Sequence, residues 1–414
     1  MQKYNLEKKF ELLVSMDIQE KDGYTWFSAS NRNGIYQINN KTHNVVNKYI
    51  VEDENFSEFV LYHDMEISEN KIFFAPHKAK CIAVYDINKE KIQYLTLNPI
   101  AEKYHFIYNP NQKFGSVFKD GLYVYLLGYT YPAIVKIHIE TLEMQYIDSW
   151  VDEVMNGVSA GDARGYFTVG SVKTGRKILL PLGYMCGVLE LDLDTDKTRL
   201  IKLDSSLDGI GGIAGNAKDI WMIGRGKIVN KIVRWNIQNN ELQEIDIPID
   251  ENDCVVPFHA PLCYKDKVFL FPIYANYAYE IEIIDERINI CKLLETIIQE
   301  KNKKNDLRIN TFSPRITDGK IKFITGEKQE WYEYDLENGQ IESCLIRDND
   351  NIDICIQEYA KRSINEFWKT NIVWESFYQL NDYIDVICFN NEKKCFDSKR
   401  IMGREIFSVL RNVK

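Results

Sequence analysis

The 414-residue sequence has no run of 18 uncharged apolar residues, and its first residues bring back a charge every few positions. It therefore predicts no transmembrane helix and no signal peptide, and we expect a cytoplasmic protein without a membrane partner. The nine cysteines are scattered singly, without a C-x-x-C pair. This pattern favours reduced thiols that behave as small hydrophobic side chains over a disulfide framework or a zinc site.

The sequence also lacks an excess of basic residues, because 51 Lys and Arg stand against 61 Asp and Glu, for a net charge of -10. A general nucleic-acid binder needs a basic surface, so no nucleic-acid partner is predicted. Phosphate-binding loops, nucleophile elbows, H-E-x-x-H and EF-hand loops are missing as well. Because the histidines come from separate repeats without paired spacing, we predict no metal and no cofactor.

A repeated pattern is the strongest signal in the sequence. An apolar run with a polar residue near its centre is followed by a polar turn and another apolar run, and this recurs seven times. The spacing between copies is 44 to 54 residues. The central polar residues, used here as markers, are Gln37, Asp86, His138, Asp192, Asn236, Glu282 and Asp335.

Two more strands are predicted before each marker. One begins about 12 to 16 residues upstream, and a shorter one precedes it, for example at 11–16, 59–62, 166–169 and 257–260. Four antiparallel strands in each of seven repeats are typical of an all-β, seven-bladed β-propeller. Six or eight blades are the alternatives if a terminal repeat is misassigned.

Over roughly residues 10–348 this architecture resembles the kelch-like, galactose-oxidase-like propeller group. The resemblance lies in the period of about 50 residues, which is longer than that of WD-repeat blades. The kelch double glycine is not repeated, since Gly211-Gly212 is the only adjacent glycine pair, and no Trp-Asp dipeptide closes the strands. The resemblance is therefore one of architecture.

After residue 348 the pattern changes from strands to a helical stripe. We predict a propeller at 1–348 and a helical C-terminal extension at 349–414 that packs on it. Two roles are open for the extension: shielding a blade edge, or docking a partner protein through Phe367, Trp368 and Trp374. The residues at helical spacing are Ile356, Tyr359, Ala360, Ile364, Phe367 and Trp368.

The loops between second and third strands, and the crossings between blades, should share one face of the ring. We call it the long-loop face, because these segments are longer and more varied than the turns on the other face. The residues predicted to bind a ligand there lie just after second strands or within crossings. They are His77, His105, Tyr129, Arg164, Tyr184, Arg225, Tyr274 and Glu327.

Large aromatic and polar side chains gathered on one face favour stacking and directional hydrogen bonds. We predict a non-catalytic propeller that binds a peptide or glycan-like ligand, or that scaffolds a partner enzyme. The alternative is a hydrolase or lyase acting on a carbohydrate or modified peptide, with His77, His259 and Arg225 as acid, base and charge stabiliser. A structural assembly module is a third interpretation, and the sequence does not decide whether a reaction occurs.

Overall fold

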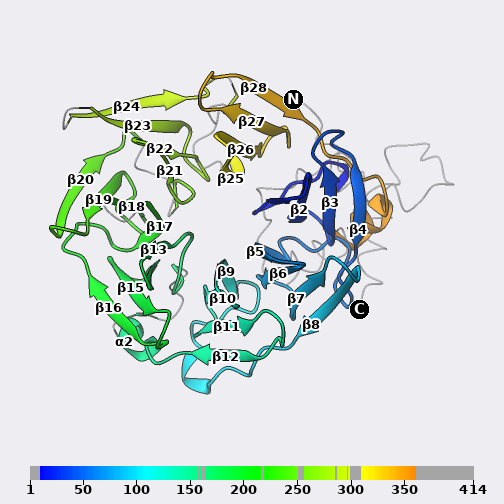
Figure 1. The fold of residues 1–414 in the computed structure, drawn as a ribbon, viewed down its shortest axis with the longest axis horizontal. Helices are drawn as coiled ribbons and strands as arrows, with labels where there is room; N and C mark the ends of the chain where they lie inside the picture. Colours follow the sequence, from blue (N-terminus) through cyan, green and yellow to red (C-terminus); the bar gives the residue numbers. More distant parts are fainter. Residues whose placement is uncertain are drawn as a thin grey trace, which may run out of the picture.

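The protein is built as a ring of blades around one axis (Figure 1). Within the described part of the chain, 28 strands form seven antiparallel sheets of four consecutive strands each, here blades 1 to 7 in chain order. This confirms the predicted seven-bladed β-propeller. The computed structural model describes residues 10–156, 158–159, 162, 164–215, 219–249, 256–284, 287–295, 297–298 and 309–359.

In each blade the first strand lies nearest the axis. The first strands are β1 (Gln19–Lys21), β5 (Tyr62–Ser68), β9 (Phe114–Asp120), β13 (Val172–Thr174), β17 (Ile210–Gly215), β21 (Leu262–Tyr264) and β25 (Thr311–Thr317). The second strands are β2 (Tyr24–Ser28), β6 (Lys71–Pro76), β10 (Tyr123–Gly128), β14 (Lys177–Pro181), β18 (Asp219–Gly224), β22 (Lys267–Leu270) and β26 (Lys320–Thr325).

The third strands carry all seven marker residues, and the fourth strands form the outside of the ring. The third strands are β3 (Ile35–Asn39), β7 (Ile82–Asp86), β11 (Ile134–His138), β15 (Gly187–Asp192), β19 (Lys231–Asn236), β23 (Ala278–Ile284) and β27 (Trp331–Asp335). The fourth strands are β4 (Val45–Tyr49), β8 (Lys91–Leu95), β12 (Met144–Ile147), β16 (Thr198–Lys202), β20 (Glu241–Asp246), β24 (Arg287–Leu293) and β28 (Ile341–Cys344).

One local turn explains the regular spacing of third and fourth strands. In blade 2, Asp86 Oδ1 accepts the main-chain N–H groups of Asn88 and Lys89, and Glu90 adopts a left-handed φ of 52°. The same side-chain turn recurs in five other blades. In blade 1 its acceptor is Asn39, so the marker Gln37 was assigned two residues before the equivalent position. The equivalent residues are Asn39, His138, Asp192, Asn236 and Asp335.

The innermost strands begin later than the sequence predicts. The runs predicted at 11–16, 166–169 and 257–260 form only isolated bridges, and the strands begin at Gln19, Val172 and Leu262. In blade 2 the run 59–62 ends where β5 starts, and the pairing with β6 shifts register around His63. These apolar residues are buried without joining a regular ladder, which the hydrophobic pattern alone does not distinguish from a strand.

The hydrophobic core lies between neighbouring blades. Tyr125 and Leu127 of β10 belong to the same buried cluster as Leu180 and Leu189 of blade 4, for example. Fully burying such a side chain contributes about 1.5–3 kcal/mol. Cys81, Cys186, Cys263, Cys291, Cys344 and Cys355, which lie in the described residues, are free thiols, as predicted.

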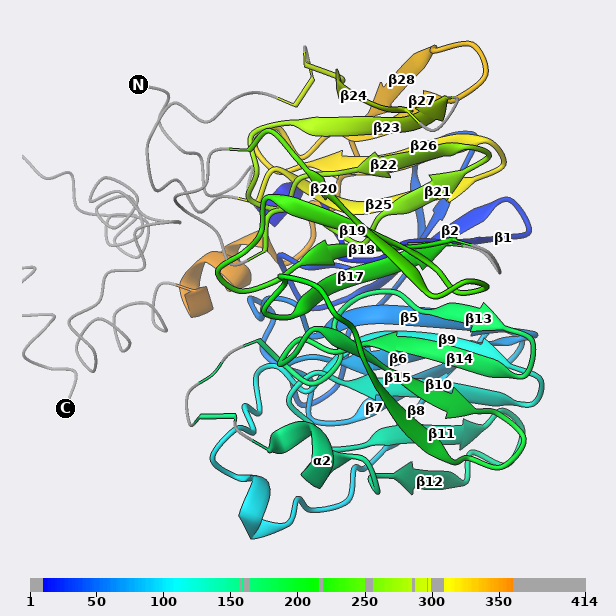
Figure 2. The same cartoon turned by 90° about the vertical axis from the view of Figure 1, so that its left-hand side faces the viewer.

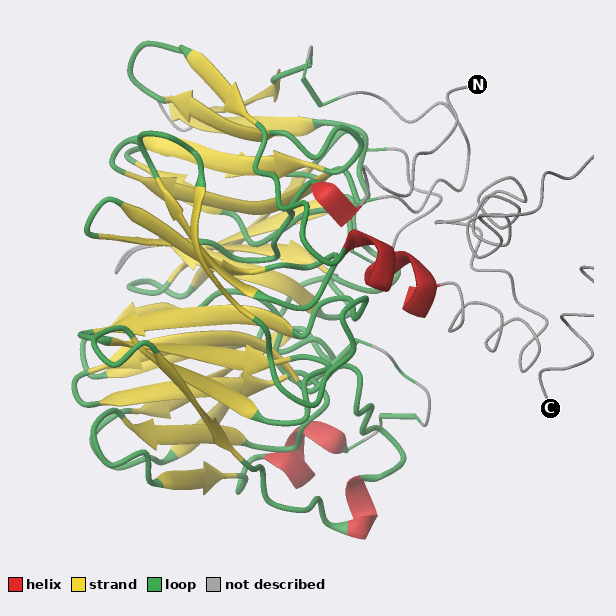
Figure 3. Cartoon of the chain, turned by 90° about the vertical axis from the view of Figure 1, so that its right-hand side faces the viewer, coloured by secondary structure: helices red, strands yellow, loops and turns green. Residues whose placement is uncertain are grey.

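The two faces of the ring differ. The short hairpins project on one face, and every helix of the described residues lies on the long-loop face (Figures 2 and 3). These helices include η1 (Glu102–Tyr104), α2 (Val151–Met155) and a helix at 352–359. The rest of the predicted helical extension, with Ala360, Ile364, Phe367, Trp368 and Trp374, lies outside the described residues. Among those described, no helix is long and apolar enough to span a membrane.

Candidate functional site

The inner rim of the long-loop face is held by polar contacts between blades. Thr168 Oγ1 donates to the Ile210 carbonyl at 2.8 Å, which joins blade 4 to blade 5. His259 Nε2 lies 2.8 Å from the Thr311 carbonyl, so this nitrogen carries the proton and joins blade 6 to blade 7. Such contacts satisfy buried polar groups and fix the positions of the loops above them.

His77 follows β6 and lies between blades 2 and 3. Its Nδ1 is 3.1 Å from the Phe114 carbonyl, so Nδ1 donates and Nε2 is the basic nitrogen. Its ring centroid is 5.2 Å from that of His63 and 6.4 Å from that of Tyr129. Burial, with the neighbouring His63 and two lysines, lowers the pKa of His77 to about 3. The imidazole is therefore neutral at pH 7.

Tyr129 and Arg225 meet although they come from blades 3 and 5. Arg225 Nη2 donates to the Tyr129 hydroxyl, and the guanidinium carbon is 5.5 Å from the centroid of the Tyr129 ring. The Arg225 residue is only 8% exposed. Burial raises the pKa of Tyr129, with the Arg225 charge opposing this shift, so the phenol is neutral at pH 7. The contact joins a cation and an aromatic ring across blade 4.

The crossing from blade 3 to blade 4 brings an ion pair to the same place. Arg164 donates from Nε and Nη2 to the Asp162 carboxylate at 2.7–3.0 Å, and from Nη1 to the Asp208 carbonyl at 3.0 Å. The Tyr184 hydroxyl lies 3.4 Å from the Asp162 carbonyl oxygen. Although burial raises the pKa of Asp162, the hydrogen bonds from Arg164 hold it below its usual value.

A glycine lets this crossing lie against the tyrosine. Gly165 has a φ of +84°, and a Cβ added to it would be 2.6 Å from Tyr129 Cε2. Any side chain at this position would displace the ring. We call the group that converges here, from blades 2 to 5, the rim cluster: His77, Tyr129, Asp162, Arg164, Tyr184 and Arg225.

The other residues predicted to bind a ligand have different surroundings. Tyr274 is half-buried in blade 6, where its main-chain N–H donates to the Pro257 carbonyl at 3.1 Å. Glu327 is exposed in the turn between β26 and β27. His105 is exposed, with Nε2 3.1 Å from the Ile100 carbonyl. Of the eight predicted residues, only five therefore meet around blades 2 to 5: His77, Tyr129, Arg164, Tyr184 and Arg225.

The sequence places Asp64 beside His63 on an innermost strand, but it did not predict the partners that this carboxyl group meets near the axis. Asp64 Oδ2 accepts the Val117 N–H at 2.8 Å, and Asp17 Oδ1 pairs with Arg315 Nη1 at 3.2 Å. Burial raises the pKa of Asp64 well above its ordinary value, and the neighbouring Asp17 adds to the shift. Residues from blades 1, 2, 3 and 7 meet here, and no spacing in the sequence signals it. No group of three or more metal-ligating side chains occurs in the described part of the chain.

No family model and no curated protein matches this chain. Among solved structures it is similar in fold to virginiamycin B lyase from Staphylococcus aureus, with a TM-score of 0.55, 14% identity, and coverage of 78% of this chain and 94% of that one. A catalytically inactive histidine-to-alanine variant of that lyase with quinupristin has a TM-score of 0.53 at 14% identity. The match covers 77% of this chain and 93% of that one.

A second protein of similar fold is the extracellular domain of the putative one-component system BT4673 from B. thetaiotaomicron. Its TM-score is 0.53 at 14% identity, and the match covers 80% of this chain and 41% of that one. At such identities the similarity establishes a propeller fold and does not assign the chain to a family.

Proposed function

We propose that this protein is a binding propeller whose rim cluster takes a peptide segment or a glycan-like ligand, or a segment of a partner enzyme, on the long-loop face. The observation that carries the proposal is convergence: six polar and aromatic side chains from blades 2 to 5 meet at one part of the rim. Arg225 reaches across blade 4 to do so.

The chemistry of the cluster supports this class of ligand. The half-buried Tyr129 supplies a planar face, which can stack on a sugar or peptide plane, whereas the Tyr184 ring is buried against Tyr166 and supports the cluster from below. Arg164 and Arg225 supply planar sets of N–H donors, and neutral His77 supplies an acceptor. The kelch-like interpretation rests on the blade period, and the cytoplasmic location rests on sequence composition; both remain predictions.

A hydrolase or lyase is the second candidate, and a specific observation favours it. His63 Nδ1 is buried and has no hydrogen-bond partner among the described residues, and the His63 ring lies 5.2 Å from that of His77. Burial lowers the pKa values of His77 and His259 to about 3 and about 4. At these pKa values both imidazoles are neutral at pH 7, so His77 does not fit the predicted acid role, and both rings accept protons only weakly. The fold of the virginiamycin B lyase shows that a propeller can accommodate a lyase.

Glycan and peptide arrays test the leading proposal directly. We expect wild-type protein to bind a defined set of ligands, and the double variant Tyr129→Phe, Arg225→Gln to lose that set. Glu327→Gln, on the same face but outside the rim cluster, is the matched control and should bind as wild type does. Binding that survives in the folded double variant would exclude the rim cluster as the site.

The second candidate is tested on the same ligand. Turnover of the array-selected ligand, abolished by His77→Ala while circular dichroism shows an intact fold, would favour a hydrolase or lyase. Binding of the ligand without turnover would support the non-catalytic function and exclude a hydrolase or lyase acting on that ligand.

A further inference from the structure

The ring is not closed by a shared strand in the part of the chain that the structure describes, because each blade consists of four consecutive strands. Blade 7 must therefore be joined to blade 1 in another way. Residues 10–14 run beside residues 345–348: Leu12 bridges to Arg347, and the Leu13 N–H donates to the Ile346 carbonyl at 2.9 Å. The Trp331 indole N–H of blade 7 also donates to the Leu13 carbonyl at 2.8 Å.

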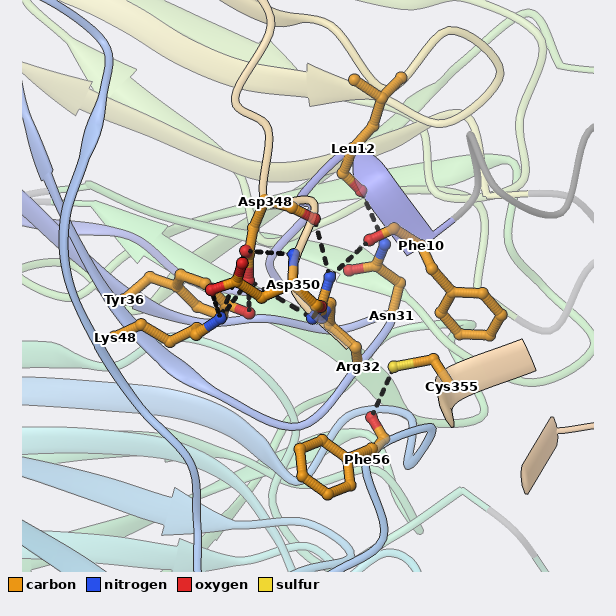
Figure 4. Close-up of polar contacts among 10 residues, drawn as sticks. All are labelled: Phe10, Leu12, Asn31, Arg32, Tyr36, Lys48, Phe56, Asp348, Asp350 and Cys355. Carbon is orange, nitrogen blue, oxygen red and sulfur yellow. Dashed lines mark hydrogen bonds and ion pairs between the residues drawn. The ribbon is translucent and has the colours of Figure 1, made fainter. Parts of the chain in front are cut away.

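Arg32 lies at the centre of this junction (Figure 4). It belongs to the β2–β3 loop of blade 1 and is 0% exposed. Its Nη1 donates to the carbonyls of Phe10 at 3.0 Å and Asp348 at 2.9 Å, and its Nη2 donates to the Asp350 carbonyl. One side chain thus joins the N-terminal segment, blade 1 and the segment that leaves blade 7.

The charge of Arg32 is balanced by Asp348. Arg32 Nη2 lies 3.4 Å from Asp348 Oδ2, which also accepts the Tyr36 hydroxyl at 2.8 Å and pairs with Lys48 Nζ at 3.1 Å. Although burial raises the pKa of Asp348, the Asp350 N–H and the Arg32 charge hold it below its ordinary value. The carboxylate is therefore ionised. Removing it would leave the buried Arg32 charge uncompensated, whereas removing Arg32 would leave Lys48 as the cationic partner of Asp348.

The chain then crosses blade 1 toward blade 2. In the helix at 352–359, the Tyr359 ring packs edge-on against Phe10 at 5.5 Å and against Phe59 at 5.4 Å. Cys355 Sγ donates to the Phe56 carbonyl at 3.6 Å. The segment therefore reaches from blade 7 over blade 1 to the crossing that begins blade 2.

We propose that residues 345–359, together with Arg32 and Phe10, form a clasp whose release opens the ring at the junction of blades 7 and 1 while the other six junctions stay closed. Arg32 makes the clasp cooperative, because its contacts to the N-terminal segment and to residues 348–350 form or break together. Near the axis this junction has the Ser313–Ser15 and Arg315–Asp17 contacts, which we expect to loosen once the clasp is released.

Hydrogen–deuterium exchange by mass spectrometry on the full chain tests the clasp. In Arg32→Lys, one ammonium group cannot reach all three carbonyls. We expect peptides from residues 10–21, 311–325 and 345–359 to exchange about tenfold faster or more than in wild type, with blades 3 to 5 unchanged. Lys265→Gln, whose exposed partner Glu337 lies on the other face, is the control and should change none of these peptides.

A milder variant keeps the test decisive if Arg32→Lys does not fold. Tyr36→Phe removes only the hydroxyl bonded to Asp348 and should accelerate exchange in the same peptides, by a smaller factor. Faster exchange spread evenly over all seven blades, or unchanged exchange at 345–359 in these variants, would overturn the proposal.

Discussion

Arg32 and Arg225 occupy the same kind of loop, after the second strand, in blades 1 and 5. Arg32 is fully buried among main-chain carbonyls and Asp348, whereas Arg225 donates a hydrogen bond to the Tyr129 hydroxyl at the rim. The difference comes from what the neighbouring chain supplies: the two terminal segments cover the loop of blade 1, and a crossing with a glycine lies beside the loop of blade 5. The loop between the second and third strands thus serves ring closure in blade 1 and, we propose, ligand binding in blade 5.

The largest expected effect is on the free energy of unfolding, which should fall much more when Arg32 is replaced than when Arg225 is replaced. Arg32→Met should lower the free energy of unfolding by about 3–5 kcal/mol, because the carbonyls of Phe10, Asp348 and Asp350 lose their donor and the buried Asp348 carboxylate keeps only Lys48 as a cationic partner. Arg225→Met should lower it by only about 1 kcal/mol, because the Tyr129 hydroxyl it contacts is neutral. Urea unfolding of both full-length variants at pH 7 measures the difference. Equal losses would contradict the distinction.

As the pH falls, the stabilising contribution of His259 at the inner rim should be lost before the Asp348 carboxylate of the clasp is protonated. The pKa of His259 is about 4 in the folded protein against an ordinary 6.5, so its contribution is present above pH 6.5 and is lost as the pH falls to 4. The loss is about 3 kcal/mol. The pKa of Asp348 is lowered, so the clasp keeps its ionised carboxylate over this range.

The pH dependence of unfolding in His259→Gln checks this expectation. The variant should show a flatter decline in the free energy of unfolding between pH 6.5 and 4 than wild type. Parallel curves for the two proteins would mean that His259 does not carry the acid sensitivity.

Two glycines provide a matched test of the contact at Tyr129. Gly165→Ala and Gly175→Ala both place a side chain on left-handed backbone, but only at position 165 does the new Cβ meet the Tyr129 ring. We expect Gly175→Ala to cost about 1 kcal/mol and Gly165→Ala about 2 kcal/mol or more. Thermal unfolding gives the stabilities, and ligand binding should weaken in Gly165→Ala alone. Unimpaired binding there would show that the position of the Tyr129 ring does not matter.

The smallest expected difference is between two hydroxyl groups. Tyr36→Phe removes a 2.8 Å bond to an ionised carboxylate and should cost about 1.5 kcal/mol. Tyr184→Phe removes a 3.4 Å contact to a carbonyl and should cost less than about 0.5 kcal/mol. Urea unfolding under identical conditions compares them, and the reverse order would contradict the assignment of Tyr36 to the clasp.

Local rules made the repeat predictable. In six blades the turn after the third strand uses an acceptor side chain such as Asp86, which the sequence shows, whereas the left-handed residue four positions later includes types such as Leu142 that do not signal it. The starts of the innermost strands were predicted wrongly, because register shifts such as the one at His63 depend on pairing with the next strand.

The candidate site was only partly predictable. Equal loop positions suggested that His77, Tyr129 and Arg225 share one face, and the structure brings them together. The clasp was not foreseen, because Arg32 and Asp348 are 316 positions apart and no pattern links them. Contacts between distant segments depend on how the ring closes, which neither composition nor spacing encodes.

Calorimetric titration of the array-selected ligand into Arg225→Gln tests the central claim most directly. The account predicts a Kd raised by about tenfold or more, which is about 1.4 kcal/mol of binding free energy, in a protein whose free energy of unfolding stays within about 1 kcal/mol of wild type. An unchanged Kd in the folded variant would contradict it.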